Sequence, residues 1–88
     1  MYAVINEYDR PNDDVRGAEI VSTTDSFVDA IICAADTIAD IVSDDLNDDS
    51  WERVDIVEVA NVQDAIDLLE SGEYYETGSL FHWDTSIK

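Results

Sequence analysis

Apolar and acidic positions separate between residues 24 and 45, and the other predicted elements are arranged around this stretch. At the helical period of about 100° per residue, apolar side chains gather on one side and aspartates on the other. The apolar side holds Phe27, Ile31, Ala34, Ile38, Ile41 and Val42, and the acidic side holds Asp25, Asp29, Asp36, Asp40 and Asp44. The pattern predicts an amphipathic helix with Thr24 or Ser26 as its N-cap.

The acidic side of this helix forms a row of regular pitch. Because a helix rises about 1.5 Å per residue, Asp36, Asp40 and Asp44 are expected roughly 6 Å apart along one edge. No basic residue interrupts the row. Asp44 and Asp45 would lie at the C-terminal end of the helix, where the macrodipole disfavours anions. We therefore expect this acidic surface to serve a purpose besides folding.

Four other segments are predicted to be β-strands. Residues 2–8 are aromatic and β-branched and carry apolar side chains on both faces, and 18–23 would return after the turn-forming residues between them. Residues 51–59 alternate in part, which predicts a strand with one mainly buried face. The last strand, 79–84, follows a turn at Gly78.

A second, shorter helix is predicted after the third strand. Asn61 is placed to cap it, and Gly72 is a natural stop. Its apolar side holds Ala65, Ile66, Leu68 and Leu69, while Asp67 and Glu70 extend the acidic character of the chain.

The element order β-β-α-β-α-β predicts a single α+β domain over residues 1–88. We expect a four-stranded sheet with both helices on one face, because each helix has one apolar stripe to bury. In that arrangement, the acidic stripes of the two helices would point outward together as one negative surface.

The charge of the chain narrows the range of partners. Its 22 acidic residues face only four basic ones, a formal net charge of −18, yet 45% of the residues are hydrophobic, enough for a folded core. Such a surface repels nucleic acid and anionic membranes and attracts basic proteins. The predicted partner is therefore a basic protein, with no direct contact to nucleic acid or membrane. The candidate partner-binding residues are Asp25, Asp29, Asp36, Asp40, Asp44, Asp45, Asp48, Asp49, Asp67 and Glu70.

The acidic stretch 44–50 superficially matches a calcium loop. Asp45, Asn47 and Asp49 would fill positions 1, 3 and 5 of an EF-hand loop. Position 6 is then Ser50 instead of glycine, and position 12 is Ile56 instead of a bidentate glutamate. The match fails at its two diagnostic positions, so no metal site is predicted there.

No catalytic residue or cofactor is predicted, and we expect the protein not to be an enzyme. The one cysteine, Cys33, excludes an internal disulfide and is expected to pack as a partly buried thiol. The one histidine, His82, has no identifiable serine or cysteine partner and is expected to be structural. The aromatic side chains Tyr74, Tyr75 and Trp83 fit either a core or an exposed anchor.

The N-terminus gives an expectation of cytoplasmic localisation. Residues 1–5 lack the basic start and longer apolar run of a signal peptide, and no stretch reaches the 18 or so apolar residues of a membrane span.

Small size, extreme acidity and the helix from Asp29 to Asp45 together resemble, as a class, the phage-encoded DNA-mimic inhibitors that block restriction enzymes or CRISPR effector complexes. Those inhibitors share no single motif, so the resemblance covers a composition and one helix. It implies a stoichiometric, non-catalytic protein that acts in the cytoplasm of an infected bacterium. Duplex DNA carries one charge per roughly 1.7 Å of axis. A mimic would therefore draw on both helices and on residues 44–49, and a second subunit in a homodimer is one further source of charge.

Adaptation to high salt is the alternative explanation of the acidity. Aspartate outnumbers glutamate 15 to 7, and Lys88 is the sole lysine. At molar salt the Debye length is about 3 Å, so a heavily acidic surface costs little and maintains solubility. In that case the chain is a small halophile-adapted protein or a generic interaction module, whose binding surface lies elsewhere.

Overall fold

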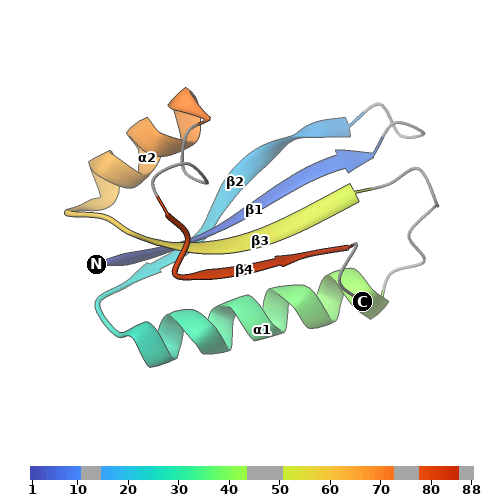
Figure 1. Cartoon of the computed structure of the whole chain (residues 1–88), viewed down its shortest axis with the longest axis horizontal. Coiled ribbons are helices and arrows are strands. Elements are labelled where there is room, and N and C mark those ends of the chain that lie inside the picture. Colours follow the sequence, from blue (N-terminus) through green and yellow to red (C-terminus); the bar gives the residue numbers. More distant parts are fainter. Residues whose placement is uncertain (11–14, 44–50, 73–77, 86–88) are drawn as a thin grey trace.

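Two helices lie on opposite sides of a four-stranded antiparallel sheet (Figure 1). The structure is a computed structural model, and it describes residues 1–10, 15–43, 51–72 and 78–85. The strand order is β2-β1-β3-β4, and every neighbouring pair is antiparallel. In chain order the elements are β1 (Tyr2–Arg10), β2 (Val15–Thr24), α1 (Phe27–Ser43), β3 (Trp51–Glu58), α2 (Val62–Ser71) and β4 (Phe81–Asp84).

The predicted α+β class and the element order are confirmed. β1 and β2 form the expected hairpin, with an irregularity between Val4 and Ile5 that shifts their register. β1 and β3 occupy the middle of the sheet and pair from Tyr2 opposite Glu58 to Asp9 opposite Trp51. β2 and β4 are the outer strands of the sheet.

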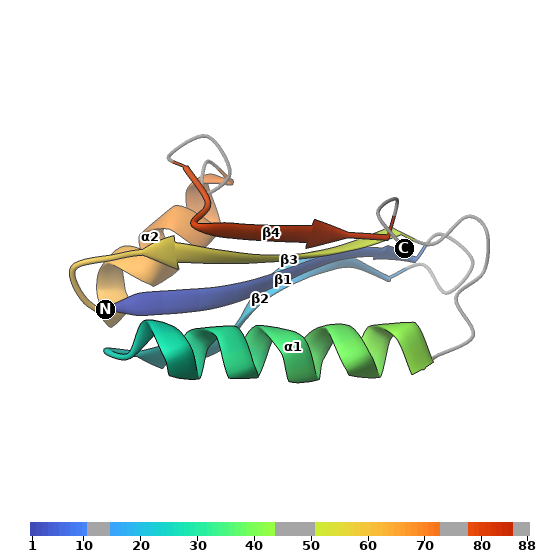
Figure 2. The same ribbon diagram turned by 60° about the horizontal axis from the view of Figure 1, so that its bottom comes forward.

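The prediction that both helices cover one face of the sheet is wrong. α1 packs on a cluster that contains Val4 and Ile56, whereas α2 packs on a cluster that contains Ala3 and Val57. Successive residues of a strand point to opposite faces, so these two clusters lie on the two sides of the sheet. Figure 2 shows α1 below the strands and α2 behind them, at the end of the sheet where β1 begins. The physical reason is that β1 and β3 are apolar on both faces, so each face needs its own cover.

The prediction that β3 has one mainly buried face is also wrong. Val54 and Ile56 are fully buried beneath α1, and Val57 is buried on the side of α2. Two charged side chains of the same strand, Glu52 and Asp55, are fully buried as well. A central strand between two helical layers has little exposure on either face.

α1 begins where the sequence predicts. Ser26 caps it, since the Ser26 hydroxyl accepts a 3.3 Å hydrogen bond from the backbone N–H of Asp29. The side that faces the sheet is built on Ala30 and Ala34, both fully buried, and on Ile41. Phe27, Ile31 and Val42 are exposed instead of buried, which corrects the predicted apolar side.

α2 is defined at both ends by the predicted residues. The side-chain oxygen of Asn61 accepts a 2.9 Å hydrogen bond from the N–H of Asp64. Gly72 ends the helix in the left-handed conformation, with φ 72°, and its N–H donates to the Leu68 carbonyl. Ala65 is the fully buried residue of this helix.

The aromatic residues of β4 belong to the layer beneath α1. Phe81 and Trp83 are half-buried and pack against the cluster that contains Val4 and Ile56. Trp83 is therefore largely a core residue, while Tyr74 and Tyr75 lie outside the described residues.

Candidate protein-binding surface

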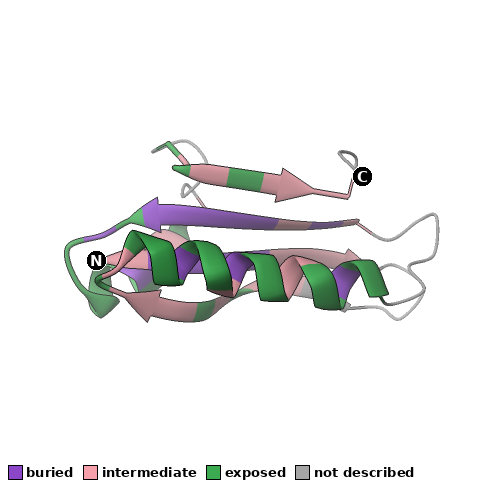
Figure 3. Ribbon diagram, turned by 90° about the horizontal axis from the view of Figure 1, so that it is seen from below, coloured by how far each residue is buried: buried purple, intermediate pink, exposed green. Residues whose placement is uncertain are grey.

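Three of the predicted acidic residues line one groove. Asp29, Asp36 and Asp40 are exposed on α1 and are separated by seven and four residues, which places them on one side of the helix. Figure 3 shows that the exposed side of α1 runs along the whole helix. The groove has a volume of about 510 Å³, and it is lined by Val21 of β2 and by Asp29, Ile32, Cys33, Asp36, Thr37 and Asp40 of α1.

The other predicted acidic residues are not gathered into this groove. Asp25 is exposed in the bend that precedes α1. Asp67 and Glu70 are exposed on α2, on the opposite side of the sheet, and Asp67 accepts a hydrogen bond from Gln63. The prediction of one continuous acidic surface over both helices is therefore wrong. Asp44, Asp45, Asp48 and Asp49 lie outside the described residues.

α1 also exposes apolar side chains, and none of them is among the predicted partner-binding residues. Val28, Ile32 and Val42 are 66%, 54% and 56% exposed. Val21 of β2, on the wall of the groove, is 39% exposed. The outer side of α1 thus combines acidic and apolar groups. A helical wheel of residues 27–43 would have predicted the exposed apolar side chains, because the apolar arc of the helix is wider than the face that the sheet can cover.

Cys33 lies at the boundary between this groove and the core. Its thiol is partly buried and packs against the cluster beneath α1, as predicted. Its carbonyl accepts a 2.9 Å hydrogen bond from the Thr37 hydroxyl.

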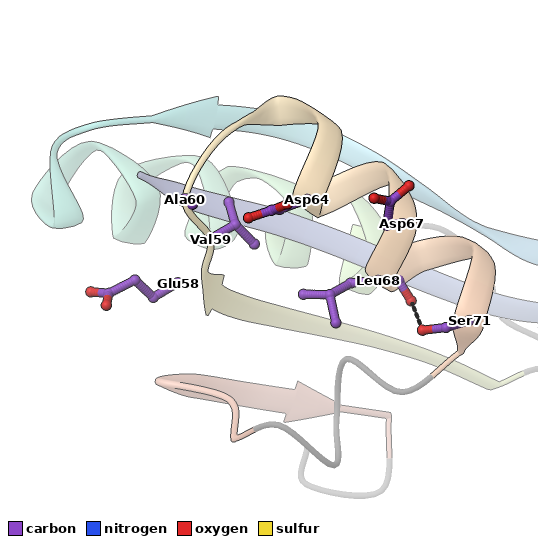
Figure 4. Close-up of a pocket in the computed structure, with 7 residues that line it drawn as sticks. All are labelled: Glu58, Val59, Ala60, Asp64, Asp67, Leu68 and Ser71. Atoms are coloured by element: carbon purple, nitrogen blue, oxygen red, sulfur yellow. Dashed lines mark hydrogen bonds between the residues drawn. The ribbon is translucent and has the colours of Figure 1, made fainter.

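A second pocket, of about 480 Å³, lies beside α2 (Figure 4). The end of β3 and the connection to α2 contribute Glu58, Val59 and Ala60, and α2 contributes Asp64, Asp67, Leu68 and Ser71. The Ser71 hydroxyl donates to the Leu68 carbonyl. The lining contains three carboxylates and no basic, thiol or imidazole group, so it offers no pair of groups suited to nucleophilic catalysis.

A polar cluster around the buried side chain of Asp55 joins β3 to β4. Asp55, fully buried, accepts two hydrogen bonds from Arg53, at 2.6 and 3.1 Å, and one from the Ser79 hydroxyl at 2.7 Å. The Nδ1 atom of His82 lies 2.9 Å from Asp55 Oδ1, and its Nε2 atom lies 2.7 Å from Asp84 Oδ2. The cluster therefore links β4, an outer strand, to β3 in the middle of the sheet.

The environment shifts the pKa of both central groups of the cluster. Burial acts to raise the pKa of Asp55, but the hydrogen bonds from Arg53, Ser79 and His82, with the charge of Arg53, outweigh it and lower this pKa below its ordinary value. Burial and the charge of Arg53 act to lower the pKa of His82, but its bonds to Asp55 and Asp84 and the charge of Asp55 outweigh them and raise this pKa. Both ring nitrogens face carboxylates, which favours the imidazolium form.

The geometry of this cluster does not suit serine hydrolase chemistry. Ser79 donates to Asp55 and not to His82, and both nitrogens of His82 are engaged by carboxylates. A nucleophile needs a neutral base within hydrogen-bond reach of its hydroxyl. The carboxylate partners of His82 were not predicted from the sequence. The sequence did contain a usable signal for these contacts. Arg53 and Asp55, like His82 and Asp84, are two residues apart on a strand, so each pair lies on one face of the sheet.

The described residues contain no group of three or more histidine, cysteine, aspartate or glutamate side chains arranged to hold a metal ion. Neither helix of the described part of the chain has the length and apolar character needed to span a bilayer. Comparisons with protein-family models, curated proteins and solved structures found no match.

Proposed function

We propose that this protein binds the basic nucleic-acid-binding surface of a host defence complex through α1 and blocks DNA binding, as an anti-CRISPR or anti-restriction inhibitor would. The observation that carries the proposal is the row of exposed carboxylates of Asp29, Asp36 and Asp40 along one groove. On this proposal the protein acts without catalysis or a cofactor, in the cytoplasm of the cell that contains the complex.

Electrostatic attraction is the physical basis of the proposal. A net charge of −18 on 88 residues draws basic surfaces over distances set by the Debye length, about 10 Å at 0.1 M salt. The carboxylates of α1 would occupy positions that phosphates take in a protein–DNA complex. Since α2 faces the other way, the contact rests on α1 alone, with Asp25 at its start.

Salt adaptation is the second candidate, and one observation favours it. Exposed acidic residues occur on both sides of the sheet, for example Asp36 on α1 and Glu70 on α2, and only solvent meets both sides at once. That explanation accounts for the acidity of α2. It gives no role to the exposed Val28, Ile32 and Val42, which a surface selected only for solubility would replace with polar residues.

The test is inhibition of DNA binding by purified restriction and CRISPR effector complexes, measured by mobility shift in about 0.1 M salt. The wild-type protein is expected to release DNA from at least one complex near equimolar ratio. A variant with Asp29→Lys, Asp36→Lys and Asp40→Lys is expected to lose this effect, because its groove would repel the basic surface.

A matched variant separates the α1 surface from net charge alone. Asp64→Lys, Asp67→Lys and Glu70→Lys change the net charge of the chain by the same amount on exposed positions of α2. This variant is expected to inhibit as the wild type does. Equal loss in both variants would contradict a role specific to α1, and no inhibition by the wild type across the complexes would contradict the proposed function.

A further inference from the structure

The groove between α1 and β2 combines negative charge with exposed apolar surface. Its lining contains three carboxylates, from Asp29, Asp36 and Asp40, and the apolar side chains of Val21 and Ile32. More than half of Ile32 and more than a third of Val21 is exposed. A partner that only carries positive charge would leave this apolar surface in water.

We propose that the groove binds a basic amphipathic helix of the partner, which pairs its lysine or arginine side chains with the three aspartates and seats an apolar side chain on Val21 and Ile32. This inference rests on the proposed function, since both require α1 to face a basic partner. It adds the form of the partner segment and an apolar anchor. The apolar stems of lysine and arginine cover further apolar surface while their charged ends reach the carboxylates.

The spacing of the aspartates favours a helix as the occupant. Asp36 and Asp40 are four residues apart on α1, about 6 Å along its axis, and Asp29 lies seven residues before Asp36, about 10 Å. A second helix that runs alongside α1 has the same rise per residue. Three basic residues at intervals of seven and then four therefore meet all three carboxylates when the partner helix runs parallel to α1. In an antiparallel partner helix the order of the two intervals is reversed. α1 has 17 residues, about 25 Å, so a partner segment of four to five turns covers it.

The probe for the test is a labelled synthetic helical peptide with lysines at intervals of four and seven on one face and a leucine between them on that face. Two control peptides have the same composition with the lysines moved out of register, or serine in place of the leucine. Binding is measured by fluorescence anisotropy at 50 mM and 500 mM salt. The matched peptide is expected to bind at 50 mM at least tenfold more tightly than either control, and to weaken strongly at 500 mM.

Protein variants identify the surface and the apolar anchor. Ile32→Gln is expected to weaken binding of the matched peptide about tenfold, because it removes the apolar seat. Val28→Gln is the matched control: Val28 is exposed on the same helix but does not line the groove, so this variant is expected to bind as the wild type does.

The outcomes separate this inference from the proposed function. If the triple charge reversal of α1 abolishes binding while Ile32→Gln and the lysine register have no effect, the amphipathic helix is excluded and an electrostatic contact remains. If the matched peptide does not bind at 50 mM salt, the inference is overturned, and the DNA-displacement assay judges the proposed function independently. Equal binding of the matched peptide to the α1 and α2 charge-reversed proteins would overturn the inference, because the peptide would then not depend on the carboxylates of α1.

Discussion

Asp55 shows how a buried charge is stabilised at the scale of single residues. Its side chain has no exposure, and it is surrounded by donors from Arg53, Ser79 and His82. A buried carboxylate is stable only when such partners replace the water it has lost. The hydrogen bonds from Arg53, Ser79 and His82 outweigh burial and lower the pKa of Asp55, which favours its ionised form.

Replacing Asp55 with asparagine is therefore expected to destabilise the fold. The substitution removes the charge that Arg53 and His82 face, at a cost of about 2–3 kcal/mol in the free energy of unfolding. The matched control is Asp29→Asn, an exposed position with the same change in charge, which is expected to stay within about 0.5 kcal/mol of the wild type. Urea unfolding measures both, and similar values for the two variants would contradict the role of Asp55.

His82 makes a separate prediction about pH. Because the folded-state pKa of His82 is raised above its ordinary value of 6.5, its contribution to stability is complete below about pH 6.5 and is lost as pH rises through the folded-state pKa. The wild type is expected to lose more stability between pH 6 and pH 9 than His82→Gln does, in urea unfolding at both pH values. Groups common to both proteins cancel in this comparison. Equal pH dependence would show that the two carboxylate contacts do not hold the imidazolium.

At this scale the sequence identified local contacts and missed distant ones. The capping roles of Ser26 and Asn61 were predictable because a cap side chain and the backbone N–H that donates to it are three residues apart. The partners of His82 were not predictable, because Asp55 lies 27 residues away and the contact depends on the register of β3 against β4.

At the scale of elements, small side chains determine how closely α1 approaches the sheet. Ala30 and Ala34, one turn apart, are fully buried over the central strands, and Ala35, the next residue, is exposed. A larger side chain at a fully buried alanine has no space to occupy in a close-packed core.

Ala34→Leu is expected to destabilise the protein by about 1–3 kcal/mol, since it forces overpacking between α1 and the sheet. Ala35→Leu, exposed on the same helix, is the control and is expected to change stability by less than about 0.5 kcal/mol. Thermal or urea unfolding compares the two. If Ala34→Leu is as stable as Ala35→Leu, α1 does not pack on the sheet through this residue.

All six elements could be predicted from the sequence, but the side on which each helix packs could not. Element type follows from periodicity and turn residues, which are local. The side of the sheet depends on strand order: β1 and β3 lie in the centre and need cover on both faces. Apolar residues on both faces of 2–8 were a usable signal, because they indicate a strand between two layers.

At the scale of the whole molecule, the arrangement of the helices limits what the acidity can do. With α1 and α2 on opposite sides, one partner surface meets the carboxylates of one helix. The total charge of −18 nevertheless acts at a distance and opposes folding through self-repulsion. An acidic surface that recruits a basic partner works only where salt leaves the attraction unscreened, because the Debye length falls from about 10 Å at 0.1 M to about 3 Å at 1 M.

Far-UV circular dichroism of the purified protein from 0.1 M to several molar KCl therefore tests most directly whether the acidity serves binding. The account predicts full helix and sheet signals already at 0.1 M KCl, with little change as KCl is added. The reason is that the apolar clusters on the two faces of the sheet outweigh the repulsion between the acidic side chains. A protein that is unfolded at 0.1 M and folds only near molar KCl would contradict the account, since its acidity would then be an adaptation to salt that leaves no electrostatic attraction for a partner.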